Sequence, residues 1–136
     1  MERKDYVELA NFRLALRRFL AFSEAAVGTV GITSQQYQAL LAIKASPEES
    51  LAIKELAAEL LVAPHGAVQL VDRLEDQGLV ARRSLDTDLR VVLIGLTAKG
   101  DQVVETLATD HMGELLRQRP LLAESLRRLR AIGKQR

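Results

Sequence analysis

Residues 64–94 read PHGAVQLVDRLEDQGLVARRSLDTDLRVVLI, and this stretch decides the fold. In its first half apolar side chains recur every three or four residues, which predicts a helix over 64–77 that begins at a proline and is ended by Gly78. Beyond that glycine the apolar period changes to two, which predicts short strands at 79–83 and 90–94 around a polar turn. The stretch therefore predicts a helix followed at once by a β-hairpin.

A second short helix is predicted immediately before this stretch. Apolar side chains at helical spacing indicate about two turns of amphipathic helix; they are Ile53, Leu56, Ala57 and Leu60. Two helices joined by a tight turn and followed by a hairpin form a winged helix-turn-helix. The second helix of such a lobe fits the DNA major groove, which is about 12 Å wide, and the hairpin reaches the neighbouring backbone or minor groove. The predicted fold class is therefore mainly α (α+β).

On the N-terminal side, two further helices are predicted. Residues 5–27 have the apolar periodicity of a helix with a broad buried face. Thr33 and Gln36 then form a capping box, in which each side chain satisfies a backbone donor of the other. The helix that they begin is expected to end before Ser46-Pro47, because the residue that precedes a proline is disfavoured in helical conformation.

On the C-terminal side, Thr97 is expected to cap a helix that runs from Ala98 to about Arg117. Gly100 and Gly113 weaken this helix, by about 1 kcal/mol each relative to alanine where they are exposed. Pro120 is expected to begin a last, separate helix.

The terminal segments carry more apolar helical surface than one small winged lobe can cover. We expect residues 1–136 to form a single domain, with the DNA-binding lobe at about 33–96 and with 5–27 and 101–132 as the dimerisation helices of a homodimer. A two-fold dimer would present two recognition helices to a pseudo-palindromic site in double-stranded DNA. The alternative is a monomer whose terminal helices pack on their own winged lobe.

The predicted recognition helix offers candidate DNA contacts on the side that faces away from the core. His65 and Gln69 lie on its first turns, where base edges come within reach, and Arg73 lies nearer the phosphates. Gly66 permits a close approach. The candidates on this helix are Pro64, His65, Gly66, Gln69 and Arg73. The alternative is that these side chains are only the solvated side of a surface helix.

The hairpin tip places Arg90 beside two carboxylates, Asp86 and Asp88. A guanidinium is attracted to the narrow and electronegative minor groove, and neighbouring carboxylates can hold it at the required angle. The strand predicted directly after Arg90 is expected to fix its backbone. The alternative is an ordinary polar turn with a local ion pair.

Composition narrows the function further. The 136 residues are 48% hydrophobic and 27% charged with a net charge of +1, and residues 51–100 are slightly acidic. This balance is not typical of a nucleic-acid binder, so DNA binding must depend on where the charges lie. Apolar runs are too short to span a membrane and no cationic leader begins the chain, so we expect a cytoplasmic protein with no membrane partner.

Catalysis and cofactors are not expected. The sequence has no cysteine, which excludes disulfides, thiol nucleophiles and thiol oxidation as a sensing mode. The two histidines, His65 and His111, lie far apart and lack the spacing of metal ligands. No nucleophile with its base and no glycine-rich phosphate loop is present. We therefore expect no metal, no cofactor and no enzyme.

Four segments together resemble a known family: IKELA at 53–57, LVDRLEDQGLV at 70–80, the tip Asp88-Leu89-Arg90, and LTAKG at 96–100. In combination they resemble the MarR family of bacterial transcriptional regulators, and the flanking helices match in order and length. The resemblance implies a homodimer with interlocked first and last helices, a recognition helix at 64–77 and Arg90 as the wing arginine. It also implies a ligand cleft between the dimer helices and the DNA-binding lobe.

Departures from the family pattern also occur. The family often has a second arginine before the Asp-x-Arg unit, where this chain has residues 85–87. Ala52 stands where a serine or threonine cap is common, and Pro64 and Gly66 make the recognition helix less polar than is typical. These departures concern the affinity for DNA and the strength with which the base sequence is read; they do not concern the fold.

The sequence is compatible with two functions. The first is a dimeric, sequence-specific DNA-binding transcriptional regulator, a repressor relieved by a small-molecule ligand that the sequence does not identify. Phe12, Phe19 and Tyr37 are candidates for lining the ligand cleft, although aromatic residues on helix faces are more often plain core. The second is a winged-helix protein–protein interaction module that has lost DNA binding, which the slightly acidic middle of the chain favours. Salt-dependent DNA affinity would separate the two functions.

Overall fold

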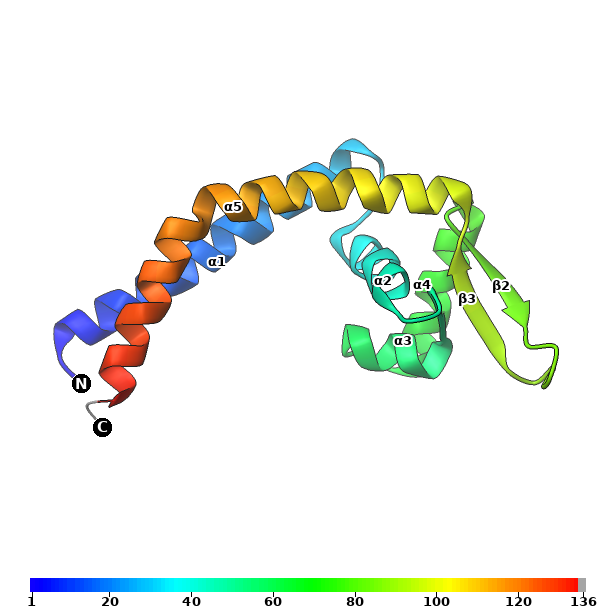
Figure 1. Ribbon diagram of the computed structural model, residues 1–136, viewed down its shortest axis with the longest axis horizontal. Coiled ribbons are helices and arrows are strands. Elements are labelled where there is room, and N and C mark those ends of the chain that lie inside the picture. Colours follow the sequence, from blue (N-terminus) through cyan, green and yellow to red (C-terminus); the bar gives the residue numbers. More distant parts are fainter. Residues whose placement is uncertain (135–136) are drawn as a thin grey trace. The chain divides into compact units, whose positions relative to one another are not determined.

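The computed structural model describes residues 1–134 (Figure 1). The elements in chain order are α1 (Arg3–Thr29), α2 (Ser34–Ala45), β1 (Ser50–Ala52), α3 (Ile53–Leu60), α4 (Pro64–Asp76), β2 (Val80–Ser84), β3 (Val92–Leu96) and α5 (Ala98–Lys134). The chain divides into two compact units. We call Val27–Ala108 the winged lobe, and Met1–Ala26 with residues 109–134 the helical unit.

The winged lobe has the predicted mixture of helices and a small antiparallel sheet. Within the described residues the sheet has three strands in the order β1-β3-β2, and Leu51 pairs with Ile94 while Arg82 pairs with Ile94 from the other side. The side chains of α2, α3, α4 and β3 fill one core, whose fully buried members include Leu40, Ile43, Leu56, Val71, Leu74 and Ile94. Burial of each such side chain contributes about 1.5–3 kcal/mol to folding. The predicted fold class is confirmed.

Several local predictions are also confirmed. The capping box is present, since the Thr33 N–H donates to Gln36 Oε1 at 2.9 Å and the Gln36 N–H donates to Thr33 Oγ1 at 3.1 Å. Helix α2 ends at Ala45, directly before Ser46 and Pro47. Gly78 follows α4 with φ +75°, the left-handed backbone for which glycine is favoured.

The strand bounds differ from the predictions by one or two residues. The Leu79 N–H donates to the Leu74 carbonyl, so this residue closes α4 and β2 begins only at Val80. The Val91 N–H donates to the Asp88 carbonyl, so Arg90 and Val91 belong to the turn and β3 begins at Val92. Strand β1 was not predicted, because three residues are too few to show an alternating pattern.

The predicted break at Pro120 is wrong, because α5 continues through this residue to Lys134. Proline removes one helical hydrogen bond, and side-chain pairs on both sides of it support the helix locally. Glu114 accepts hydrogen bonds from Arg117 and Gln118, and after the proline Glu124 accepts hydrogen bonds from Arg127 and Arg128; pairs at this spacing stabilise a helix.

The helical unit is built from α1 and α5. His111 is buried, its Nε2 lies 2.6 Å from Ser23 Oγ, and its ring packs nearly perpendicular to those of Phe19 and Phe22. Arg128 of α5 also binds Glu8 of α1 at 3.2 Å. In the described part of the chain, no helix combines the length and the apolar character needed to cross a membrane.

Candidate nucleic-acid interface

Helix α4 presents one face to the core of the lobe and the opposite face to solvent. Its buried side chains are Ala67, Leu70, Val71 and Leu74. The exposed side chains His65, Gln69, Asp72 and Asp76 recur every three or four residues, so they form a single stripe along the helix. We call these four residues the outer stripe of α4. Arg73 is exposed beside it.

The first turn of α4 is shaped for a close approach. Pro64 is the first helical residue, where it leaves no backbone donor unpaired. A Cβ added at Gly66 would meet Val62 Cβ at 3.9 Å, which is ordinary contact. The packing of the lobe therefore does not require glycine at this position, and a role in the approach to DNA stays a prediction.

The wing brings together two of its three predicted residues. The Arg90 side chain is 91% exposed, and its Nε donates to Asp88 Oδ1 at 3.1 Å. The Arg90 backbone N–H donates to the same oxygen at 3.0 Å. These hydrogen bonds, first from the side chain and then from the backbone of Arg90, hold the pKa of Asp88 below its usual value. Asp86 is exposed in the same turn, and among residues 1–134 the structure gives it no hydrogen bond to Arg90.

The backbone of Arg90 is fixed by the turn rather than by a strand. The Leu85 N–H donates to the Val91 carbonyl at 3.1 Å and closes the tip directly beside Arg90. Leu89, between the paired residues, is 75% exposed. The arginine therefore projects from a closed turn into solvent.

The structure assigns a role to the segment LTAKG that the sequence did not reveal. Thr97 Oγ1 donates to the Gly78 carbonyl at 2.6 Å, and Lys99 Nζ donates to the Gln77 carbonyl at 3.1 Å. A Cβ added at Gly100 would lie 1.9 Å from the Leu79 carbonyl oxygen. The start of α5 is thus locked onto the end of α4. The glycine that sequence reasoning treated as a weakness is required for this close approach.

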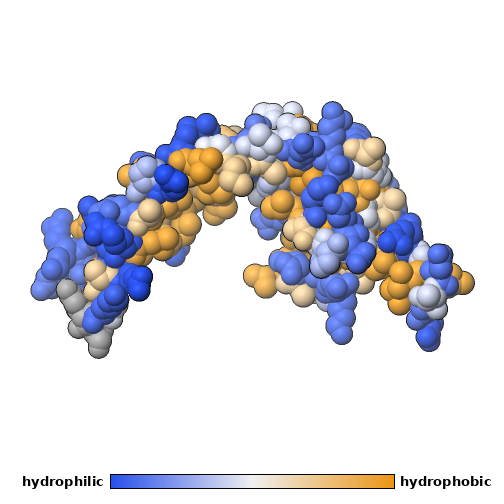
Figure 2. Space-filling view, in the orientation of Figure 1, coloured by the Kyte–Doolittle hydropathy of each residue, from blue (hydrophilic) through white to orange (hydrophobic). Residues whose placement is uncertain are grey.

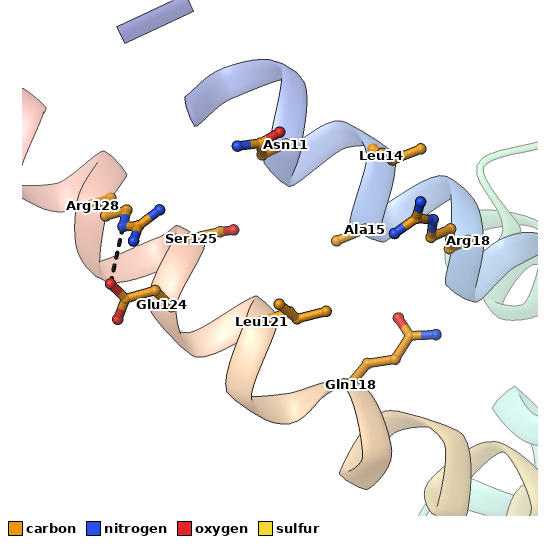
Figure 3. Close-up of a pocket in the computed structure, with 9 residues that line it drawn as sticks. All are labelled: Asn11, Leu14, Ala15, Arg18, Gln118, Leu121, Glu124, Ser125 and Arg128. Atoms are coloured by element: carbon orange, nitrogen blue, oxygen red, sulfur yellow. Dashed lines mark hydrogen bonds and ion pairs between the residues drawn. The ribbon is translucent and has the colours of Figure 1, made fainter. Parts of the chain in front are cut away.

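A second surface of interest lies on the helical unit. Large apolar side chains are exposed on both of its helices (Figure 2), among them Tyr6, Leu9, Leu16 and Leu20 on α1 and Met112, Leu116, Leu121 and Leu126 on α5. A groove of about 480 Å³ lies between the helices. Ala15 and Leu121 point toward one another across it, and Arg18 and Arg128 lie at its rim (Figure 3).

The three aromatic candidates for a ligand cleft lie in both units. Phe12 and Phe19 are half-buried on α1, where Phe19 contacts His111. Tyr37 belongs to the winged lobe, where it is buried, and this burial raises the pKa of its hydroxyl. A cleft lined by all three stays a prediction. The part of the chain that the structure describes contains no group of three or more side chains arranged to hold a metal ion.

Two helices at a tight turn, with a hairpin that carries an exposed arginine, define a winged helix-turn-helix protein. A family model described as the MarR family matches residues 30–90. The organic hydroperoxide resistance transcriptional regulator of Bacillus subtilis (strain 168) is 32% identical over 102 residues, which cover 75% of this chain and 67% of that protein. The transcriptional repressor MdtR of the same organism is 31% identical, over 69% of this chain and 59% of that protein.

Solved structures show the same fold. A mutant of MarR from E. coli, complexed with operator DNA, is similar with a TM-score of 0.69 at 24% identity, over 90% of this chain and 88% of that one. The chain belongs to the MarR family of transcriptional regulators.

Proposed function

We propose that this protein is a dimeric, sequence-specific DNA-binding repressor that occupies a pseudo-palindromic operator. The observation that carries the proposal is that the winged lobe exposes both the outer stripe of α4 and the wing residue Arg90. The Arg90 side chain is 91% exposed and is held by Asp88. The name of MdtR as a repressor and the operator DNA in the E. coli MarR structure support it.

Each residue has a distinct role in this proposal. His65 and Gln69 read base edges in the major groove, Pro64 and Gly66 allow the first turn to approach, and Arg73 binds phosphate. Arg90 enters the minor groove, where the negative potential is focused. Asp88 holds its side chain, and Asp86 is the second carboxylate of the same turn.

A second copy of the chain covers the exposed apolar side chains of the helical unit. Soluble monomers rarely expose contiguous apolar patches of this kind, and such patches are typical of interaction sites. The segments 5–27 and 101–132 hold the dimer, and the groove between α1 and α5 belongs to the surface that the partner covers. Two-fold symmetry then places two α4 helices one DNA turn apart.

A small molecule that binds beside the dimer helices relieves repression. The 136 residues contain no cysteine, so none of them can respond to a hydroperoxide through a thiol. We expect the protein to act in the cytoplasm, without a cofactor and not as an enzyme; the two named relatives are regulators.

Selection of bound fragments from random duplex DNA by the purified protein tests the proposal. We expect enrichment of a pseudo-palindrome with half-site centres about 10 bp apart, bound with an affinity that falls as salt rises. The competing function is a protein-interaction module, which the three carboxylates on α4 favour. That function predicts no enriched sequence.

A further inference from the structure

Arg82, near the base of the wing, binds two carboxylates of the recognition helix. Its Nη2 donates to Asp72 Oδ1 at 2.5 Å and its Nη1 donates to Glu75 Oε1 at 2.7 Å. The Arg82 side chain is 27% exposed, against 57% for Asp72 and 43% for Glu75. One guanidinium therefore bridges two positions, almost one turn apart, on α4.

The sheet register explains why this arginine reaches α4 and its neighbour does not. Side chains alternate along β2, so Arg82 shares a face with the buried Val80, whereas Ala81 and Arg83 are exposed on the other face. A planar guanidinium offers donors in a fixed fork, so it can bind two carboxylates at once. Lysine would supply the charge without this geometry.

The position of the two carboxylates on α4 links this contact to the proposed DNA-binding surface. Asp72 lies on the outer stripe of α4, in line with the proposed base-reading residues His65 and Gln69. Helix α4 carries Asp72, Glu75 and Asp76 against the single cation Arg73. A surface of this sign repels DNA phosphates, whose contacts dominate affinity.

We propose that Arg82 is a positioning residue for DNA binding, which acts by partly neutralising the charges of Asp72 and Glu75 and so lets the acidic side of α4 approach the phosphates. This inference rests on the proposed DNA-binding function. Arg82 acts through the two carboxylates and does not itself bind DNA.

The electrostatic state of the arginine agrees with this role. Partial burial disfavours its charged form, but the hydrogen bond to Asp72 and the charge of Glu75 outweigh burial and raise the pKa of Arg82. Arg82 therefore keeps its positive charge throughout the physiological pH range. Exposed ion pairs contribute little to stability, so the fold does not depend on this one.

Charge compensation tests the proposal. The affinity of Arg82→Gln for the selected operator is compared with that of the triple variant Asp72→Asn/Glu75→Gln/Arg82→Gln, which has no carboxylate left to neutralise. We expect the single variant to bind about tenfold more weakly than wild type, which corresponds to about 1.4 kcal/mol of binding free energy. We expect the triple variant to bind within about threefold of wild type. Lys44→Gln is the matched control, because Lys44 also binds two carboxylates in the winged lobe, Asp101 and Glu49, but lies on α2.

The outcomes separate the alternatives. If both the single and the triple variant bind weakly, Arg82 contacts DNA or sets the wing directly, and the proposal is overturned. Unchanged affinity in Arg82→Gln overturns it as well. Loss of a phosphate-binding arginine would lower the salt slope by about one, whereas we expect the triple variant to keep the wild-type slope. If wild type itself selects no DNA, the proposed DNA-binding function fails, and this outcome is distinct from a failure of the role of Arg82. If Arg82→Gln does not fold, the affinity of the triple variant decides: near-wild-type affinity supports the proposal and weak binding overturns it.

Discussion

Gly100→Ala is expected to destabilise the winged lobe strongly, although alanine is the better helix former. The added Cβ would lie 1.9 Å from the Leu79 carbonyl oxygen and 2.9 Å from its carbonyl carbon, and both are backbone atoms that cannot rotate away. Overpacking of this kind costs about 3 kcal/mol or more. Relief of the overlap also breaks the hydrogen bonds from Thr97 and Lys99 to the end of α4, each worth about 1 kcal/mol. Alanine recovers about 1 kcal/mol of helix propensity.

The net loss of about 4 kcal/mol corresponds to a fall of roughly 16–32 °C in the unfolding midpoint of a unit of this size. Thermal unfolding followed by circular dichroism measures it. Gly113→Ala is the control, because the same change at another α5 glycine would meet only the end of Arg117, at 3.7 Å, and is expected to leave stability unchanged or to raise it by up to about 1 kcal/mol. Equal stability of Gly100→Ala and wild type would refute the account of how α5 is locked onto α4.

Three further predictions follow from the same contacts. Leu61→Gly should stabilise the lobe by about 1 kcal/mol in urea unfolding, because Leu61 is 93% exposed and held at φ 57°, where a side chain is strained; a loss of stability would contradict this. Leu126→Asp, at a side chain 55% exposed on the helical unit, should shift sedimentation from dimer to monomer, whereas a charge on an unused surface would change nothing. Asp88→Ala should weaken operator binding although it removes a negative charge, because Asp88 holds Arg90; tighter binding, as simple electrostatics predicts, would show that the carboxylate does not position the arginine.

The fold was predictable where a local pattern decides it. The change of apolar period after Gly78 and the capping box of Thr33 and Gln36 are properties of a few consecutive residues. Continuity of α5 through Pro120 was not predictable in this way, because proline is also typical of the first turn of a new helix and the local pattern does not separate the two cases. Strand β1 depends on pairing with β3, some forty residues further along the chain.

The candidate site was likewise predictable only where residues close together in the sequence form it. Asp88 and Arg90 are separated by only one residue, so the sequence shows this pair directly. The contacts of Arg82 with α4 and of Thr97 with Gly78 join different elements. Nothing in the sequence distinguishes Arg82 from Arg83 until the sheet register places one on the α4 side of the ribbon.

The affinity of Arg90→Ala for the selected operator tests the central claim most directly. Fluorescence anisotropy at about 0.15 M salt measures it, beside an unfolding curve of the same sample. The Arg90 side chain is 91% exposed, so its loss should leave the unfolding midpoint unchanged, while affinity should fall at least tenfold because the minor-groove contact is lost. Unchanged affinity in a folded Arg90→Ala protein would contradict the account, since the wing would then take no part in binding DNA.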